Sequence, residues 1–168
     1  MATRVAILDD YQKVAQSSAD WTVLPADVEV TFFHDHLDDP DRLVARLAPF
    51  AVVGIMRERT PFPASLLERL PNLRLLITTG PRNASVDVAA AQRLGITVCG
   101  TRSSGHATAE LAMALILALA RGLLAETASV QAGGWQVGVG RDLAGATLGV
   151  VGLGRLGSRL AKIGRAHV

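Results

Sequence analysis

Leu73-Arg-Leu-Leu-Ile77 is one of five short aliphatic runs that decide the fold of this chain. The runs begin roughly 20 to 25 residues apart, which is the length of a strand, a helix and two loops. Between them, residues such as Leu43, Val44 and Leu47 have the spacing of a helix face that lies on a sheet. Alternating strands and helices predict an α/β fold with helices on both faces of a parallel sheet. The predicted strands are Val5–Leu8, Val28–Phe33, Ala51–Ile55, Leu73–Ile77 and Ile96–Val98.

A second part of the chain follows this sheet. A long helix is predicted from Ala107 to Arg121, and after glycine-rich loops the run Thr147–Val151 predicts a strand that leads into a helix from Arg155. We therefore expect a flavodoxin-like, doubly wound parallel sheet over residues 1–102. A crossover helix and linker are expected over 103–143, and the first strand, turn and helix of a Rossmann domain over 144–168.

The stretch Gly152-Leu-Gly-Arg-Leu-Gly157 lies between the predicted strand and helix, which is the context of a dinucleotide-binding motif. Gly152 permits a tight turn, Gly154 lets the backbone approach a pyrophosphate, and Gly157 lets helix and strand pack closely. Free amides and the helix dipole favour the anion there, so this motif, with Arg155 and Leu156 inside it, predicts a site for NAD or NADP. The acidic residue that separates the two cofactors would lie about 20 positions further on, past the end of the sequence.

Composition excludes several classes of protein. The chain is 49% hydrophobic and 19% charged with a net charge of +2, and acidic and basic residues are interleaved, which does not favour nucleic-acid binding. Its most apolar segment, Leu111–Ala120, is shorter than the ~20 residues of a membrane span and is expected to be a buried helix. Cys99, the one cysteine, ends an apolar run and is expected to be buried. These features favour a cytoplasmic protein without nucleic-acid or membrane partners.

Three ordered segments carry a resemblance to a known family. They are Thr78–Asp87, Ala107–Arg121 and Leu143–Gly157. In this order they resemble the substrate loop, the crossover helix and the start of the cofactor domain of D-isomer-specific 2-hydroxyacid dehydrogenases, which are phosphoglycerate dehydrogenase-like enzymes. The resemblance implies hydride transfer between NAD(P) and a 2-hydroxy or 2-keto acid. It also implies a homodimer for the full-length protein, formed through the crossover helix and cofactor domain.

The same resemblance suggests which residues bind the substrate. The turn at Thr79 and Gly80 resembles the loop whose backbone amides hold the substrate carboxylate, although Pro81 removes one amide donor. Arg82 is expected to supply charge there, and Asn83 to brace the turn.

Two further residues are candidates for the site. Arg57 follows a predicted strand and is placed toward the ligand-binding edge of the sheet, with a solvated surface arginine as the alternative. Thr108 aligns with a cofactor-contacting residue of the family, with a helix cap as the alternative.

The catalytic arginine, glutamate and histidine of the family belong to its second half, and no residue of this chain takes their place. We therefore expect the 168-residue chain to be an inactive fragment of an oxidoreductase. Ile163-Gly-Arg-Ala-His-Val168 is also what ATC GGA AGA GCA CAC GTC encodes, a string that matches a common sequencing adapter. We expect that a reading frame ran from a partial gene into adapter sequence, and an intact gene with a stop codon after Val168 would reject this.

Alternative functions are a receiver module, a nucleotide-sensing binding protein and a metal-binding protein. Asp9 and Asp10 resemble the acidic pair of a receiver module, but the third predicted strand ends in Gly54-Ile-Met-Arg57, with no carboxylate at the position that such a module phosphorylates. A non-enzymatic, nucleotide-sensing binding protein is the other alternative. His34 and His36 lie among aspartates, yet spacing fixes no third metal ligand, which favours a solvated loop. His106 is expected to precede the crossover helix as an entry residue rather than to act as an acid or base.

Overall fold

The computed structural model describes residues 2–103 and 105–165. The predictions that concern residues 166–168 therefore lie outside the described residues. The chain separates into two compact units, Met1–Ser103 and Ser104–Val168. The three-part division over 1–102, 103–143 and 144–168 stays a prediction.

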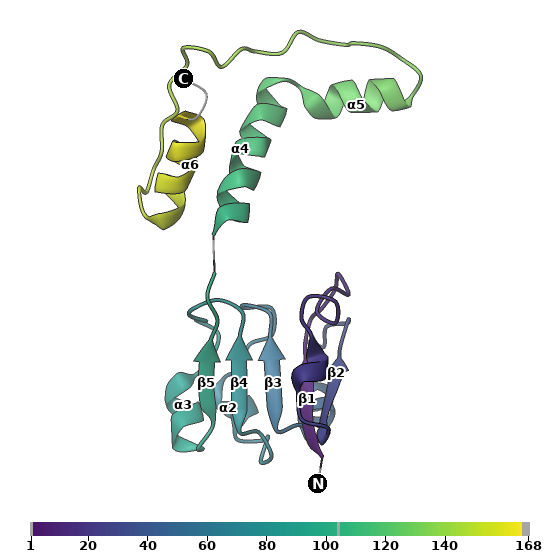
Figure 1. The fold of residues 1–168 in the computed structure, drawn as a ribbon, viewed down its shortest axis with the longest axis vertical. Coiled ribbons are helices and arrows are strands. Elements are labelled where there is room, and N and C mark those ends of the chain that lie inside the picture. Colours follow the sequence, from purple (N-terminus) through teal and green to yellow (C-terminus); the bar gives the residue numbers. More distant parts are fainter. Residues whose placement is uncertain (1, 104, 166–168) are drawn as a thin grey trace. The chain divides into compact units, whose positions relative to one another are not determined.

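The first unit is a parallel sheet of five strands in the order β2-β1-β3-β4-β5 (Figure 1). This is the flavodoxin-like order, in which the chain reverses its direction across the sheet after β2. The predicted fold class is confirmed, and the strand ends differ from the predicted ones by a residue or two. The strands are β1 (Thr3–Ile7), β2 (Val28–Phe32), β3 (Val52–Ile55), β4 (Leu75–Thr78) and β5 (Thr97–Gly100).

Three α-helices, α1 (Pro40–Leu47), α2 (Ala64–Leu67) and α3 (Val88–Arg93), supply the side chains of one hydrophobic core. Asp39 caps α1 by accepting bonds from the amides of the first turn, with Pro40 at the first helical position, and Asp87 caps α3. The core joins these helices to the sheet residues Ala6, Val53 and Leu76, which are register partners across β1, β3 and β4.

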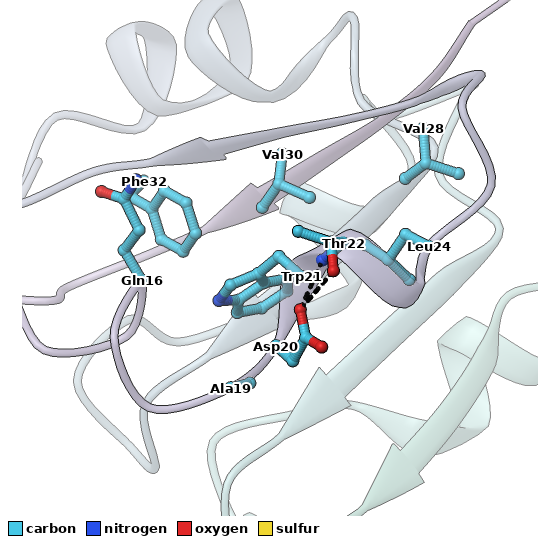
Figure 2. Close-up of a pocket in the computed structure, with 9 residues that line it drawn as sticks. All are labelled: Gln16, Ala19, Asp20, Trp21, Thr22, Leu24, Val28, Val30 and Phe32. Atoms are coloured by element: carbon cyan, nitrogen blue, oxygen red, sulfur yellow. Dashed lines mark hydrogen bonds between the residues drawn. The ribbon is translucent and has the colours of Figure 1, made fainter.

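The opposite face of the sheet is covered differently from what the sequence predicted. The segment between β1 and β2 forms only the 3-10 turn η1 (Trp21–Val23). The Trp21 ring meets the Phe32 ring edge-on, with 5.2 Å between the ring centroids. Figure 2 shows both residues. Val52, Leu75 and Ile77 on this face are half-buried, and Cys99 is exposed rather than buried. In the described part of this unit, η1 therefore takes the place of an α-helix between β1 and β2, while the predicted fold class stands.

The second unit contains three helices, α4 (His106–Ala120), α5 (Leu123–Gln131) and α6 (Arg155–Arg165). α4 is the predicted crossover helix and begins at His106, one residue before the predicted start, while α5 was not predicted. Thr147–Val151 forms no strand in the described structure, because a strand exists only when its backbone groups pair with a neighbour. The glycine stretch is therefore a bend between a segment without regular secondary structure and α6.

The second unit buries little apolar surface. Among its described residues Ala109 is the one buried hydrophobic residue, whereas Leu111, Leu115 and Leu119 on α4 are more than half exposed. The expectation that Leu111–Ala120 is buried is therefore wrong. In the described part of the chain, no single helix has the length and apolarity to span a membrane. By those two criteria alone α4 and α5 together would pass, but they are bent by 68° with respect to each other.

The first unit should depend on the contacts of β4 with the helices. Leu76 is fully buried, so Leu76→Ala should lower the free energy of unfolding of this unit by about 2 to 5 kcal/mol. Leu94→Ala, at a leucine that is 42% exposed, is the control and should cost about 1 kcal/mol or less. Urea titrations followed by NMR on the amides of β3 and β4 would measure both, and equal losses would contradict this core assignment.

Candidate site at the carboxyl edge of the sheet

The carboxyl ends of parallel strands meet at one edge of a sheet, and ligands of open α/β sheets bind there. In this unit Asp9 follows β1, Arg57 follows β3, the Thr79–Gly80 turn follows β4, and Thr101 follows β5. The four strand ends therefore bring together residues that are far apart in the sequence.

The amides of the Thr79–Gly80 turn are bonded inside the protein. Thr79 N donates to the carbonyl of Ile55 at 3.0 Å, and Gly80 N donates to Thr101 Oγ1 at 2.8 Å. The next residue, Pro81, has no amide hydrogen. A substrate carboxylate could reach these two amides only if the internal bonds were released, so the turn as folded offers it less than the sequence predicted.

Arg57 lies against this turn and is held in an uncommon backbone conformation. Its φ of +53° is left-handed, which costs a non-glycine residue of order 1 to 3 kcal/mol. Its amide donates to Thr79 Oγ1 at 3.1 Å, and its carbonyl accepts from Asn83 Nδ2 at 2.6 Å. A Cβ built on Gly80 would collide with Arg57 Nη1, so the guanidinium lies directly over the glycine.

Asn83 braces the turn through both ends of its side chain. Its amide nitrogen also donates to Thr78 Oγ1 at 3.0 Å, and its oxygen accepts from the amide and hydroxyl of Ser85 at 2.9 and 2.7 Å. Arg82 is exposed beside it. The edge of the sheet thus presents two exposed arginines, Arg57 and Arg82, at a turn whose Thr79 and Gly80 amides are paired.

The sequence analysis did not predict a network of hydrogen bonds around the buried side chain of Asp9, at the same edge of the sheet. His36 Nδ1 donates to Asp9 Oδ1 at 2.8 Å, and Thr60 Oγ1 donates to Asp9 Oδ2 at 2.6 Å. The expectation of a solvated loop is therefore wrong for His36, whose side chain is 27% exposed. The bond to Asp9 raises the pKa of His36 above its ordinary value; burial opposes this rise, and the charges of Asp9 and Asp38 add to it.

The neighbouring carboxylate has a different task. Asp10 accepts from the amides of Val14 and Ala15 at 3.0 and 3.1 Å and so caps the segment that follows it. Asp9 and Asp10 therefore do not form the open acidic pair of a receiver module. Within residues 2–103 and 105–165, no three histidine, cysteine or acidic side chains gather in a way that could hold a metal ion.

Two of the hollows on the described part of the first unit contain neither Arg57 nor Gly80 in their lining. One, of about 440 Å³, lies between the η1 segment and β2 (Figure 2). Its single acidic group, Asp20, is used by the amide and hydroxyl of Thr22. The other, of about 450 Å³, has His36 and Thr60 on its wall. Neither offers the free cation that a small carboxylic acid would need.

In the second unit the glycine stretch has the backbone that its motif requires. Gly152 has a φ of +88°. A Cβ on Gly157 would collide with the carbonyl of Gly152, so α6 packs on the turn with no room for a side chain between their backbones. Arg155 and Leu156 open α6. Thr108 is exposed in the first turn of α4, whose cap residue is Gly105, so a capping role for Thr108 finds no support.

A doubly wound α/β unit with its site at the carboxyl edge, followed by a helix and a glycine-rich turn, defines a class of α/β ligand-binding proteins. Comparison with known proteins narrows the class. Residues 5–152 match the model of the D-isomer specific 2-hydroxyacid dehydrogenase catalytic domain. The chain therefore belongs to this family.

Named relatives agree with this assignment. Hydroxypyruvate reductase of Thermotoga maritima is 34% identical over 81% of this chain, and D-3-phosphoglycerate dehydrogenase of Mycobacterium leprae is 37% identical over 93%. A phosphoglycerate oxidoreductase structure from Vibrio cholerae superposes with a TM-score of 0.88 at 39% identity, over 99% of this chain. The chain covers 44%, 30% and 53%, respectively, of the lengths of these three proteins.

Substitution of Gly80 should displace Arg57. Gly80→Ala and Gly95→Ala both place a side chain at positive φ, which costs roughly 1 to 2 kcal/mol in the left-handed region, but Gly95 has nothing near its Cβ position. We therefore expect Gly80→Ala to shift the NMR signals of Arg57 and to cost more stability than Gly95→Ala. Unchanged Arg57 signals in Gly80→Ala would show that the guanidinium does not lie on this glycine.

The pH dependence of stability should reveal the bond between His36 and Asp9. Because the folded-state pKa of His36 is raised above 6.5, protonation of His36 stabilises the fold fully below that pH, and this stability is lost as pH rises through the folded pKa. We expect the free energy of unfolding to fall over that interval. His36→Gln should remove this part of the pH profile, and an unchanged profile would contradict the assignment.

Proposed function

We propose that this chain is the substrate-binding half, with the start of the cofactor-binding domain, of an NAD- or NADP-dependent oxidoreductase that transfers a hydride between the cofactor and a 2-hydroxy or 2-keto acid. Family membership and the names of the relatives support the reaction class. The observation that carries the proposal for this chain is Arg57, whose half-exposed guanidinium lies on the turn after β4.

Arg57 is the group that would hold the acid. Its guanidinium can form paired hydrogen bonds with a carboxylate, whereas the amides of Thr79 and Gly80 already have acceptors. It lies near the carboxylate of Glu58, but the 3.9 Å between Arg57 Nε and Glu58 Oε2 is too long for a strong ion pair. Arg82 would add positive charge at the rim, and Asn83 would keep the turn in place.

The cofactor would be held at the glycine turn of the second unit. Gly152 and Gly154 would let the backbone approach its pyrophosphate, and the amides that begin α6, at Arg155, Leu156 and Gly157, would favour the anion. The missing Cβ of Gly157 fits this role, because any side chain there would push the helix off the turn. The cofactor supplies the hydride chemistry, and the protein supplies binding and orientation. Thr108 is a further proposed cofactor contact.

Activity and assembly follow from the same proposal. By resemblance, the arginine, glutamate and histidine that perform the proton transfer belong to the second half of the family's enzymes, and this chain spans about half of such a protein. We therefore expect no turnover from the 168-residue chain. The exposed leucines of α4 support a homodimer of the full-length enzyme, and the single cysteine supports a cytoplasmic location.

Substitution of Arg57 tests the substrate assignment. Arg57→Gln should weaken pyruvate binding to the 168-residue chain at least about tenfold, because the charge-assisted bonds are lost. Arg93→Gln, at an exposed arginine of α3, is the matched control and should leave the affinity unchanged. Isothermal titration calorimetry would measure both. Equal affinities in the two variants would overturn the assignment, and NADH oxidation by the pure wild-type chain with pyruvate would overturn the expected inactivity.

A further inference from the structure

Asp9 is a buried carboxylate at the edge of the site that the proposed reaction does not use. Asp9 is 1% exposed, it lies two residues after the end of β1, and its φ of +57° is left-handed. Buried charges are costly unless they are paired and hydrogen-bonded, and a left-handed aspartate is uncommon. A buried, left-handed aspartate at this edge of the sheet is therefore expected to be stabilised by the groups that it binds.

Asp9 holds the far end of the loop that carries Arg57. Its Oδ2 accepts from Thr60 Oγ1 at 2.6 Å, and its main-chain carbonyl accepts from Arg59 Nη1 at 2.5 Å. The Arg59 guanidinium also lies 4.5 Å over the ring of Tyr11. Arg59 and Thr60, the two residues that follow Glu58 in this loop, are therefore both bonded to Asp9, which is 50 or more positions away in the sequence.

The near end of the loop is fixed independently. The strand β3 ends at Ile55, whose carbonyl accepts from Thr79, and Arg59 N closes a tight turn on the carbonyl of Met56 at 3.2 Å. Arg57 lies between these two anchors and has the left-handed backbone. A loop this short, fixed at both ends, leaves its central residue little freedom, so the bonds of Asp9 help to set where the Arg57 guanidinium lies.

We propose that Asp9 is a positioning residue: through Thr60 and Arg59 it holds the 56–60 loop so that Arg57 is presented on Gly80 for the acid. The part that concerns the acid rests on the proposed function, whereas the part that concerns the loop does not. His36 completes the arrangement, because its bond to Oδ1 supplies the second donor that the buried carboxylate needs.

The chain contains a matched pair for testing this role. Asp9→Asn keeps the shape, and asparagine tolerates the left-handed backbone, but it puts an NH2 donor in place of one of the two oxygens, so the bonds that Thr60 and His36 donate to separate oxygens cannot both be kept. Asp10→Asn is the control, since Asp10 is 2% exposed and its side-chain bonds go to the amides of Val14 and Ala15. Thr60→Val and Thr60→Ser form a second pair, in which only serine keeps the hydroxyl.

The first measurement needs no ligand. In NMR spectra of the 168-residue chain, Asp9→Asn and Thr60→Val should shift the amide signals of Met56 to Arg59 and speed their hydrogen exchange about tenfold. Asp10→Asn and Thr60→Ser should leave these amides as in the wild type. If Asp9→Asn fails to fold, the threonine pair still decides. Undisturbed loop amides in Thr60→Val would overturn the proposal.

The second measurement uses pyruvate as the probe. Asp9→Asn and Thr60→Val should weaken its binding about tenfold in chains whose β-strand amides remain protected, and Thr60→Ser should restore the affinity. Unchanged affinity in the first two variants would overturn the positioning role. A wild-type chain that does not bind pyruvate would contradict the proposed function instead, and a disturbed loop in the first measurement would then still support the role of Asp9 in holding it.

Discussion

The site depends on the left-handed backbone of Arg57, because only that conformation lets a residue at the end of β3 lie over the turn after β4. The conformation is unfavourable by itself, and two hydrogen bonds from the neighbouring turn offset the cost: one to Thr79 Oγ1 and one from Asn83 Nδ2. Both partners belong to the segment that would face the substrate. The parallel sheet makes this possible, since it ends β3 and β4 at the same edge.

The fold of the first unit could be predicted because its information is local. Each strand is a short aliphatic run, and Asp39-Pro40 and Asp87 mark helix starts by their own side chains. The segment between β1 and β2 was harder, since its one 3-10 turn is stabilised by the contact of Trp21 with Phe32, which no spacing reveals. The run Thr147–Val151 has the composition of a strand, yet a strand also needs a partner, and the described structure gives it none.

The site could be predicted only in part, for a related reason. Arg57 and the glycine turns could be proposed because they lie at the ends of recognisable elements, and Asn83 because the family resemblance covers its turn. Asp9 and His36 were not connected, because their bond joins positions 27 residues apart and depends on β1 and β2 being neighbours. The engagement of the Gly80 amide by Thr101 was likewise hidden, since it requires β4 and β5 to pair in their observed register. Such long-range pairings decide which polar groups remain open to a ligand.

We propose that the side chain of Arg57, and not the backbone amides of the Thr79–Gly80 turn, binds the carboxylate of the acid. A crystal structure of the chain with D-lactate bound tests this most directly. We expect the carboxylate to lie within hydrogen-bonding distance of the Arg57 guanidinium. The bonds from Thr79 N to Ile55 O and from Gly80 N to Thr101 Oγ1 should remain intact. A carboxylate bound to those two amides, with the internal bonds broken and Arg57 turned away, would contradict it.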